Sequence, residues 1–256
     1  MQKLSTLIIA RDEEHDLPEC LESVKWADEM IVVDNGSMDK TTSIAEKNGA
    51  KVFKYDREAS QGYFSEIRNF AALKARGDWL LYIDADERVT KGLSDEISEI
   101  VRGDGGHSRA AYAIPRKNIL LGREMKHGGW WPDYVLRLIK KEALLGWEGK
   151  LHEQPKIRGE VGKLTNPLTH ITHKNLTEMV DKTNKWSEIE ATLLFESGHP
   201  KMNILRFISA GFREFWQRGI REKGFLDGTV GWIEIMYQVY SKLITYTKLW
   251  ELQLKK

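Results

Sequence analysis

The sequence predicts an α/β protein with a mostly parallel central sheet. Over roughly the first hundred residues, strand-like and helix-like segments alternate, which is typical of parallel strands joined by helical crossovers. Several strand-like runs are apolar throughout, as expected of strands that are covered on both faces. Acidic residues directly follow three of these runs, and ligands of such sheets bind beyond the carboxyl ends of the strands.

The expected elements of the first half follow from periodicity and from capping residues. Strands are expected at 4–10, 29–34, 51–55 and 79–83, and helices at 16–26, 39–49 and 64–75. In the first helix, Leu17, Leu21 and Val24 recur at helical spacing and predict its buried face. The second helix has Asp39 as its expected N-cap and Gly49 at its end.

The second half divides into a stretch with weak periodicity and a helical tail. Glycine and tryptophan are frequent between about 103 and 170, which indicates loops and short strands. The tail begins at Asn175, which forms a capping-box-like start with Glu178. Gly198 and Pro200 predict the end of this first tail helix.

Length and composition bound the class of protein. The 256 residues allow one large domain, or a core domain with an appendage. A net charge of +1 gives no reason to expect a nucleic-acid partner. The single cysteine, Cys20, excludes an intrachain disulfide and suits a reducing compartment. The apolar run at 4–10 is too short for a signal peptide, and no run of 18 uncharged apolar residues predicts a spanning helix. We therefore expect a cytoplasmic protein.

The tail differs from the rest of the chain in charge and aromatic content. Residues 200–256 carry ten Lys and Arg against five acids, together with ten of the 25 aromatic residues. Two helices expected at 204–216 and 230–250 have apolar residues at helical spacing. Three interpretations remain open: packing onto the catalytic domain, a homo-oligomer interface, or a platform that lies in a membrane interface.

Acids at the strand ends give the first indication of function. Asp84 and Asp86 follow the strand at 79–83, and Glu87 comes next. Acids at this edge usually hold a cation that serves a phosphate group. The pattern Asp-x-Asp is short enough to occur by chance. As evidence for a cation site it therefore depends on the polar residues at the other strand ends, at 11–13 and 34–37.

Four segments resemble the family 2 inverting glycosyltransferases, which have the GT-A fold. They lie at 8–14, 31–41, 68–78 and 81–87, in the family's order and spacing. Segments 131–138, 151–153 and 224–231 are similar to the lipopolysaccharide core β-1,4-glucosyltransferase subgroup. The resemblance implies a GT-A catalytic domain at 1–172 and a helical C-terminal extension at 173–256. It also implies a UDP-sugar donor, a glycan or lipid-linked acceptor of the cell envelope, and peripheral binding to the inner face of the cell membrane.

The resemblance assigns a set of nucleotide-sugar-binding residues: Ala10, Arg11, Glu13, Asp34, Arg68 and Asp84. The carboxylate of Asp34 would accept the imide N–H of uracil, although an Asp in Asp-Asn-Gly is also typical of a simple turn. Asn35 stands where the family usually has a second Asp. Asp84 would bind the ribose. Arg68 would lie near the nucleotide, or else be an ordinary surface arginine.

The same resemblance implies a divalent cation, Mg²⁺ or Mn²⁺, bound by Asp86. Hard oxygen ligands suit these metals. Glu87 would orient the acidic pair, and His170 would supply a further ligand. His152, His170 and His173 lack the spacing expected of a zinc cluster, so each is otherwise an ordinary histidine.

Inversion requires one general base for the acceptor hydroxyl. Asp133 lies where related enzymes carry this base, and Glu153 belongs to the subgroup's His-Glu pair; we favour Asp133. Either acid could instead form a loop salt bridge, with Arg137 as the partner of Asp133. Two other functions stay open: a sugar-1-phosphate nucleotidyltransferase, disfavoured by the lack of glycines after the first strand, and a non-catalytic nucleotide-sugar-binding module that docks on membranes.

Overall fold

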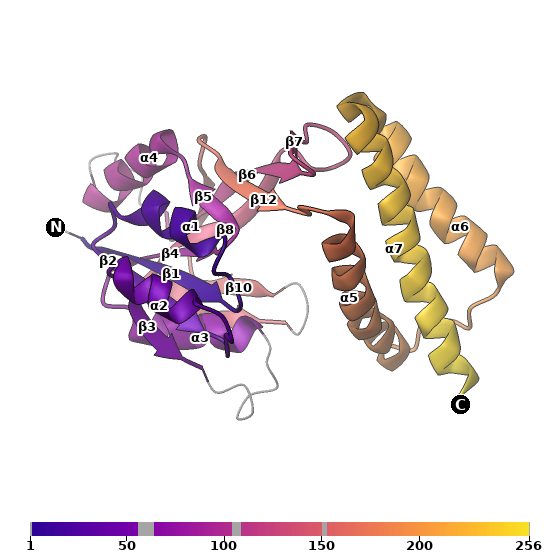
Figure 1. Cartoon of the computed structure of the whole chain (residues 1–256), viewed down its shortest axis with the longest axis horizontal. Helices are drawn as coiled ribbons and strands as arrows, with labels where there is room; N and C mark the ends of the chain where they lie inside the picture. The colour runs from indigo at the N-terminus through magenta and orange to yellow at the C-terminus, as the bar shows by residue number, and fades with distance from the viewer. Residues whose placement is uncertain (1, 56–63, 104–108, 150–152, 256) are drawn as a thin grey trace. The chain divides into compact units, whose positions relative to one another are not determined.

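The computed structural model describes residues 2–55, 64–103, 109–149 and 153–255, and Figure 1 shows their helices and strands. The chain forms two compact units. The first, which we call the sheet unit, comprises Met1–Arg116 and Tyr134–His170, and the second, the helical unit, comprises Lys117–Asp133 and Ile171–Lys256. The domain boundary at residue 172 stays a prediction.

Four parallel strands form one half of the main sheet, in the order β3-β2-β1-β4. They are β1 (Leu4–Ala10), β2 (Glu29–Asp34), β3 (Lys51–Lys54) and β4 (Trp79–Asp84). Their crossovers carry α1 (Leu17–Val24), α2 (Thr41–Lys47) and α3 (Phe64–Lys74). The predicted α/β class, with strands alternating with helices, is therefore confirmed.

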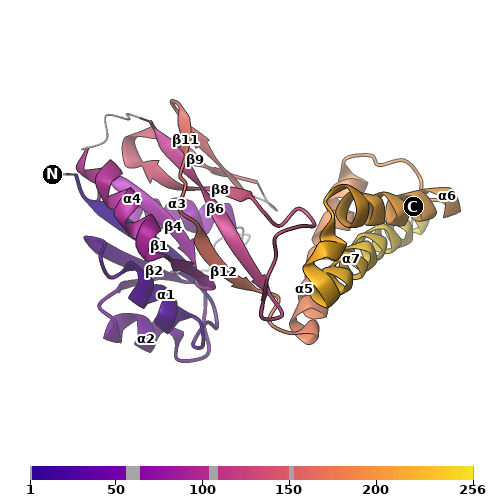
Figure 2. The ribbon, with the colours of Figure 1, turned by 90° about the horizontal axis from the view of Figure 1, so that it is seen from above.

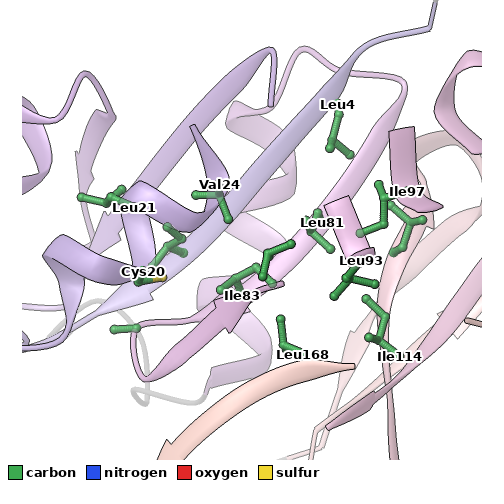
Figure 3. Close-up of a cluster of buried hydrophobic side chains, with 14 of the residues drawn as sticks. Leu4, Cys20, Leu21, Val24, Leu81, Ile83, Leu93, Ile97, Ile114 and Leu168 are labelled. Atoms are coloured by element: carbon green, nitrogen blue, oxygen red, sulfur yellow. The ribbon is translucent and has the colours of Figure 1, made fainter. Parts of the chain in front are cut away.

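Strand β1 is buried on both faces because its alternate side chains enter two different hydrophobic clusters. Leu4 and Ile8 pack in a cluster that also holds the buried side chains of α1. Leu7 and Ile9 join a second cluster, to which α3 contributes Ile67. Figure 3 shows the first cluster, with Cys20, Leu21 and Val24 of α1 beside the strands. The central strands are thus held rigidly, which fixes the position of their carboxyl ends.

The rest of the sheet consists of later strands in the order β4-β8-β6-β12-β5, with β11 also pairing with β6. These strands are β5 (Glu87–Val89), β6 (Ala111–Leu120), β8 (Asp133–Lys140), β11 (Val161–Lys163) and β12 (Leu168–Thr172). Helix α4 (Lys91–Arg102) follows β5, the 3-10 turn η1 (Lys141–Ala143) follows β8, and β9 (Leu144–Glu148) pairs separately with β10 (Gln154–Ile157). The expectation of only short strands here is wrong: β6 has 10 residues and β8 has 8, because the glycines lie between these strands and not inside them.

The helical unit contains three long helices, and α7 packs against both α5 and α6 (Figures 1 and 2). They are α5 (Leu176–Glu196), α6 (Ile204–Phe215) and α7 (Gly228–Leu254). The short elements β7 (Arg123–Glu124), η2 (Trp216–Arg221) and η3 (Gly224–Asp227) complete the unit. As predicted, Asn175 caps α5 by accepting a hydrogen bond from the backbone N–H of Glu178 at 2.9 Å. Among the described helices, none combines the length and apolarity needed to cross a membrane.

Candidate functional site

Two acids, Asp34 and Asp84, and the backbone of Ala10 lie at the carboxyl edge of the parallel strands. The register pairs Ala10 with Asp34 between β1 and β2, and Ile9 with Asp84 between β1 and β4. Strands β2 and β3 lie on one side of β1, whereas β4 lies on its other side. The strand order therefore reverses between β1 and β4. Ligands of open α/β sheets bind at such a switch point, beyond the strand ends. The structure therefore places Ala10, Asp34 and Asp84 where a ligand is expected.

Asp34 is buried and shapes the turn that follows β2. Its exposed fraction is 4%, and its Oδ1 accepts a hydrogen bond from the N–H of Ser37 at 3.0 Å. The next residue, Asn35, donates its backbone N–H to the carbonyl of Ala10 at 2.9 Å. The Oδ1 of Asn35 is buried, and it accepts no hydrogen bond from the residues that the structure describes. Asp34 therefore does stabilise the turn after β2, and the hydrogen bond from Ser37 fixes its carboxylate at the edge of the sheet.

The loop after β1 is tied to the loop after β2. The N–H of Asp12 donates to Ser37 Oγ at 3.0 Å, and the N–H of Glu13 donates to Thr41 Oγ1 at 2.8 Å. Arg11 is exposed, with its Nε 3.8 Å from Asp12 Oδ2. The backbone around Glu13 is therefore held in one place, while the side chain of Arg11 points into solvent.

Asp39 lies just before helix α2. It does not occupy the N-cap position that we expected, because Lys40 is the N-cap and the helix begins at Thr41. Its Oδ1 nevertheless accepts a hydrogen bond from the N–H of Thr41 at 2.9 Å. The second oxygen, Oδ2, accepts from the N–H of Glu14 at 3.0 Å. Asp39 therefore stabilises the helix start and the loop after β1 together.

Asp84 lies between two arginines. Arg68 Nη2 donates to its Oδ1 at 2.9 Å, and Arg137 Nη2 donates to its Oδ2. Arg137 Nη2 also donates to Glu87 Oε1 at 2.8 Å, and Glu87 Oε2 accepts the N–H of Asp84 at 2.9 Å. Burial opposes ionisation of Asp84, but Arg137 and Arg68 outweigh it and hold the pKa of Asp84 well below its usual range. The two arginines therefore favour the charged form of this carboxylate and fix its orientation.

Arg68 is a buried residue of the site and not an ordinary surface arginine. It is 5% exposed, and its guanidinium carbon lies 4.8 Å from the ring centroid of Trp147. Its Nε donates to Glu153 Oε1 at 3.0 Å. The backbone of Trp147 is held by Asn69, which accepts its N–H at 2.8 Å and donates to its carbonyl at 3.0 Å. Arg68 thereby connects Glu153 to Asp84.

Asp86 and His170 form a pair that fits a divalent cation. His170 Nε2 lies 3.4 Å from Asp86 Oδ2, with side chains 13% and 25% exposed. The pairing of β5 with β12 explains this contact, because it sets His170 opposite Glu87. Within the described ranges no cluster of three or more His, Cys, Asp or Glu could hold a metal. Mg²⁺ and Mn²⁺ need no such cluster, since one or two carboxylates together with substrate phosphates can bind them, so the Asp86 carboxylate suits either ion.

The other two candidate histidines differ in what the structure describes. His152 lies outside the described residues. His173 is part of the helical unit, where its Nδ1 lies 3.9 Å from Glu234 Oε2. Of His170 and His173, the two candidates that the structure describes, only His170 lies beside Asp86.

The two candidate bases have different surroundings. Glu153 is 16% exposed and is paired with Arg68 in the sheet unit. Asp133 belongs to the helical unit, where Asn118 Nδ2 donates to its Oδ2 at 3.2 Å. The expected pairing of Arg137 with Asp133 is wrong, since Arg137 binds Asp84 and Glu87 instead. A signal was present in the sequence: a charge inside the apolar strand Tyr-Val-Leu-Arg-Leu-Ile needs a buried partner.

Comparison with known proteins decides the family. The family model described as Glycosyl transferase family 2 matches residues 5–140, which include β1 from its second residue on, β2, β4, Arg68 and Arg137. The chain belongs to glycosyltransferase family 2. This membership confirms the resemblance found in the motifs and makes the protein an enzyme.

Relatives along the whole chain agree with this assignment. The lipopolysaccharide core biosynthesis glycosyltransferase LpsC of Rhizobium meliloti is 28% identical over 260 residues, covering 97% of this chain and 92% of LpsC. An uncharacterized glycosyltransferase of Rickettsia bellii is 28% identical over 266 residues, covering 99% of this chain and 88% of its own. The crystal structure of S. aureus TarS 1-349 in complex with UDP-GlcNAc has a TM-score of 0.51 at 17% identity, covering 99% of this chain and 92% of that one. This last likeness concerns the fold, and it agrees with the predicted GT-A architecture.

Proposed function

We propose that this glycosyltransferase moves a hexose, with glucose as the first candidate, from a UDP-sugar to a cell-envelope glycan or lipid-linked acceptor. The transfer inverts the anomeric centre and uses Mg²⁺ or Mn²⁺. The observation that carries the proposal is the meeting of Asp34, Asp84 and the Asp86–His170 pair at the edge beyond β1 and β4. The similarity to LpsC supports an acceptor of the cell envelope.

The donor site in this proposal is built from the strand ends. Asp34 accepts the imide N–H of uracil, which selects UDP over nucleotides that lack a donor there. Asp84, whose side chain is 33% exposed, receives the ribose, and its two arginines keep its carboxylate oriented. Ala10, Arg11 and Glu13 flank the nucleoside from the loop after β1.

Asp86 and His170 would hold the cation in this site. When bound there, Mg²⁺ or Mn²⁺ offsets the negative charge that develops on the UDP leaving group. Glu87 serves the site indirectly, since it accepts the backbone N–H of Asp84 and binds Arg137. The chain between Asp84 and Glu87 is therefore fixed at both ends, with Asp86 in between.

We take Asp133 as the general base. Asp133 lies where related enzymes carry this base, whereas Glu153 binds Arg68 within the sheet unit. Glu153 instead positions Arg68 beside Asp84. Replacing Asp133 by Asn should lower kcat by about 10²–10⁴-fold, the usual contribution of a general base. Glu153→Gln should chiefly raise the donor KM; a larger loss of kcat in Glu153→Gln than in Asp133→Asn would reverse the assignment.

A donor panel tests the proposed reaction. UDP release is measured with UDP-glucose, UDP-galactose and UDP-N-acetylglucosamine, each with Mg²⁺, Mn²⁺ or EDTA. Asp86→Ala should lower metal-dependent turnover by at least about a hundredfold, because a bound cation stabilises the leaving group by several kcal/mol. The matched control is Asp95→Ala, which removes an exposed acid on α4 that only pairs with Lys91. Full turnover by Asp86→Ala, or turnover unaffected by EDTA, would contradict the metal site.

The helical extension, which we place at 173–256, is proposed to dock on an anionic membrane surface. Four exposed apolar side chains recur every fourth residue along α6 and into η2: Ile204 (70%), Ile208 (62%), Phe212 (62%) and Trp216 (52%). This spacing puts them on one face of a helix. The excess of five positive charges in residues 200–256 complements anionic head groups.

Vesicle sedimentation with the full chain tests this docking. Binding to phosphatidylglycerol-containing vesicles and weak binding to phosphatidylcholine alone are expected, because both apolar burial and charge contribute. If the protein binds neither kind of vesicle but forms a dimer by light scattering, the exposed face of α6 is an interface between two copies instead.

A further inference from the structure

A buried aspartate of the helical unit holds a histidine that the reaction described so far does not use. Asp227, 3% exposed, accepts backbone N–H groups of Lys126 at 2.9 Å and His127 at 2.8 Å through its Oδ2. Its Oδ1 lies 2.9 Å from His127 Nδ1. A carboxylate can only accept, so Nδ1 carries the proton and Nε2 of the neutral imidazole is an acceptor.

The glycine-rich segment that contains Asp227 is built for this contact. A Cβ on Gly231 would lie 2.1 Å from the carbonyl oxygen of Gly224, and a Cβ on Gly224 would lie 2.8 Å from that of Arg218. Gly228, at a φ of +68°, follows Asp227 directly. Only glycine permits this close packing and this backbone conformation. The segment 224–231, singled out in the sequence, thus sets Asp227 under the backbone of residues 126 and 127.

The proposed base, Asp133, follows the same loop directly, as the first residue of β8. Gly128 donates its N–H to the carbonyl of Glu222 at 2.8 Å and accepts from Arg218 Nη1 at 3.0 Å. Asn118 Nδ2 donates both to the carbonyl of Trp130 at 3.0 Å and to Asp133 Oδ2 at 3.2 Å. The loop is therefore tied down along its length, from His127 to Asp133.

The outward side of His127 is available to a ligand. The side chain is 35% exposed, and among the described residues nothing hydrogen-bonds to its Nε2. Holding the backbone alone would need only one oxygen of Asp227; the second oxygen fixes the tautomer and orientation of the imidazole. Such second contacts are typical of histidines whose other nitrogen binds a ligand.

We propose that His127 is an acceptor-binding residue of this transferase and that Asp227 is its positioning residue. His127 Nε2 accepts a hydrogen bond from a hydroxyl of the glycan acceptor, while the proton of the attacking hydroxyl goes to Asp133. The assignment to the acceptor rests on the proposed function, because the base that follows this loop must meet an acceptor hydroxyl. The donor residues, by contrast, all lie in the sheet unit.

The first test replaces His127 by Leu in the full chain. The probe is a delipidated lipopolysaccharide core oligosaccharide from which the outer hexoses have been removed. The acceptor KM should rise about tenfold or more, the loss expected for an unpaired hydroxyl, while UDP release without acceptor stays within twofold of wild type. An unchanged acceptor KM, or an equal loss of acceptor-independent UDP release, overturns the proposal.

The second test replaces Asp227 by Asn and reads the imidazole directly. The Asn amide would face His127 Nδ1 and donate to it, so the ¹⁵N spectrum should show the proton moved to Nε2, and the acceptor KM should rise as in His127→Leu. Asp181→Asn, an exposed acid on α5, is the matched control. If Asp227→Asn only lowers the unfolding midpoint and leaves the tautomer and the KM unchanged, the contact is structural.

A binding measurement separates this proposal from the proposed reaction. Adding the oligosaccharide should shift the His127 Nε2 resonance of the wild-type protein, whether or not any UDP-sugar is turned over. A shift without turnover would refute the donor assignment and keep the acceptor site. Turnover with no shift at saturating oligosaccharide would refute the role of His127 and keep the proposed function.

Discussion

The two units distribute polarity in opposite ways. The sheet unit buries charge: Arg68 and Arg137 are each 5% exposed, and Glu87 is fully buried. The helical unit exposes apolar surface, with Ile204 at 70% and Leu205 at 73%. Buried charges persist only when they are paired, and exposed apolar side chains in a regular row indicate a missing partner. The contrast therefore separates an ionic network whose charges are paired within the sheet unit from an apolar surface that a further partner would cover.

This difference has a direct energetic consequence. Removing one member of a buried ionic group leaves its partner charged and unsolvated, which is costly. Removing an exposed apolar side chain changes little in the folded protein, because that side chain is in water in both states. The free energy of unfolding should therefore respond strongly to substitutions in the network around Asp84 and weakly to those on α6.

The largest effect is expected for Arg137→Met. This substitution leaves Glu87 and Asp84 without their shared cation, and breaking a buried pair in this way costs about 3–5 kcal/mol. The measurement is urea unfolding followed by tryptophan fluorescence. Arg102→Met, at the exposed end of α4, is the control, and we expect a change of no more than about 0.5 kcal/mol. Similar losses in the two variants would contradict the network as described.

The acids at the edge of the sheet could be predicted from the sequence because each one directly follows its own strand. Asp34 and Asp84 each follow an apolar strand, and parallel strands present their carboxyl ends on one side. Arg137 could not be assigned correctly by spacing alone. Four residues along an extended strand span about 13 Å, so a neighbour in sequence such as Asp133 is not its neighbour in space.

The contact of His127 with Asp227 could not be predicted at all. The two residues are 100 positions apart, and the contact forms only when the start of α7 packs on the 126–130 loop. The similarity of segment 224–231 to a known subgroup marked it as notable but gave no physical role. That role follows from the space around Gly224 and Gly231, which only coordinates reveal.

An intermediate effect is expected for Glu234, a buried acid of the helical unit. Burial raises the pKa of Glu234 to about 7, even though a hydrogen bond from Gln238 and the charge of Arg218 lower it. Because the folded-state pKa is the higher one, the stability contribution is fully present below about pH 4.5 and is lost as the pH rises through 7.

Glu234→Gln should remove this pH dependence. At pH 8 the variant should be more stable than wild type by about 3 kcal/mol, the value of a pKa shift from 4.5 to about 7, and at pH 4 the two should be alike. Urea unfolding at a series of pH values measures the difference. Parallel pH profiles of the two proteins would mean that Glu234 is not protonated in the folded state.

The smallest effect on stability is expected on α6. Ile208→Ser and Phe212→Ser should each change the free energy of unfolding by no more than about 0.5 kcal/mol, since both side chains are 62% exposed. Each should nevertheless weaken binding to anionic vesicles by about tenfold or more, because it removes an apolar side chain that the membrane would bury. Leu73→Ser, on α3 of the sheet unit, is the matched control at 80% exposure and should leave both quantities unchanged. A substantial loss of stability in the α6 variants would show that this face is already covered by protein, and the contrast between the two units would then disappear.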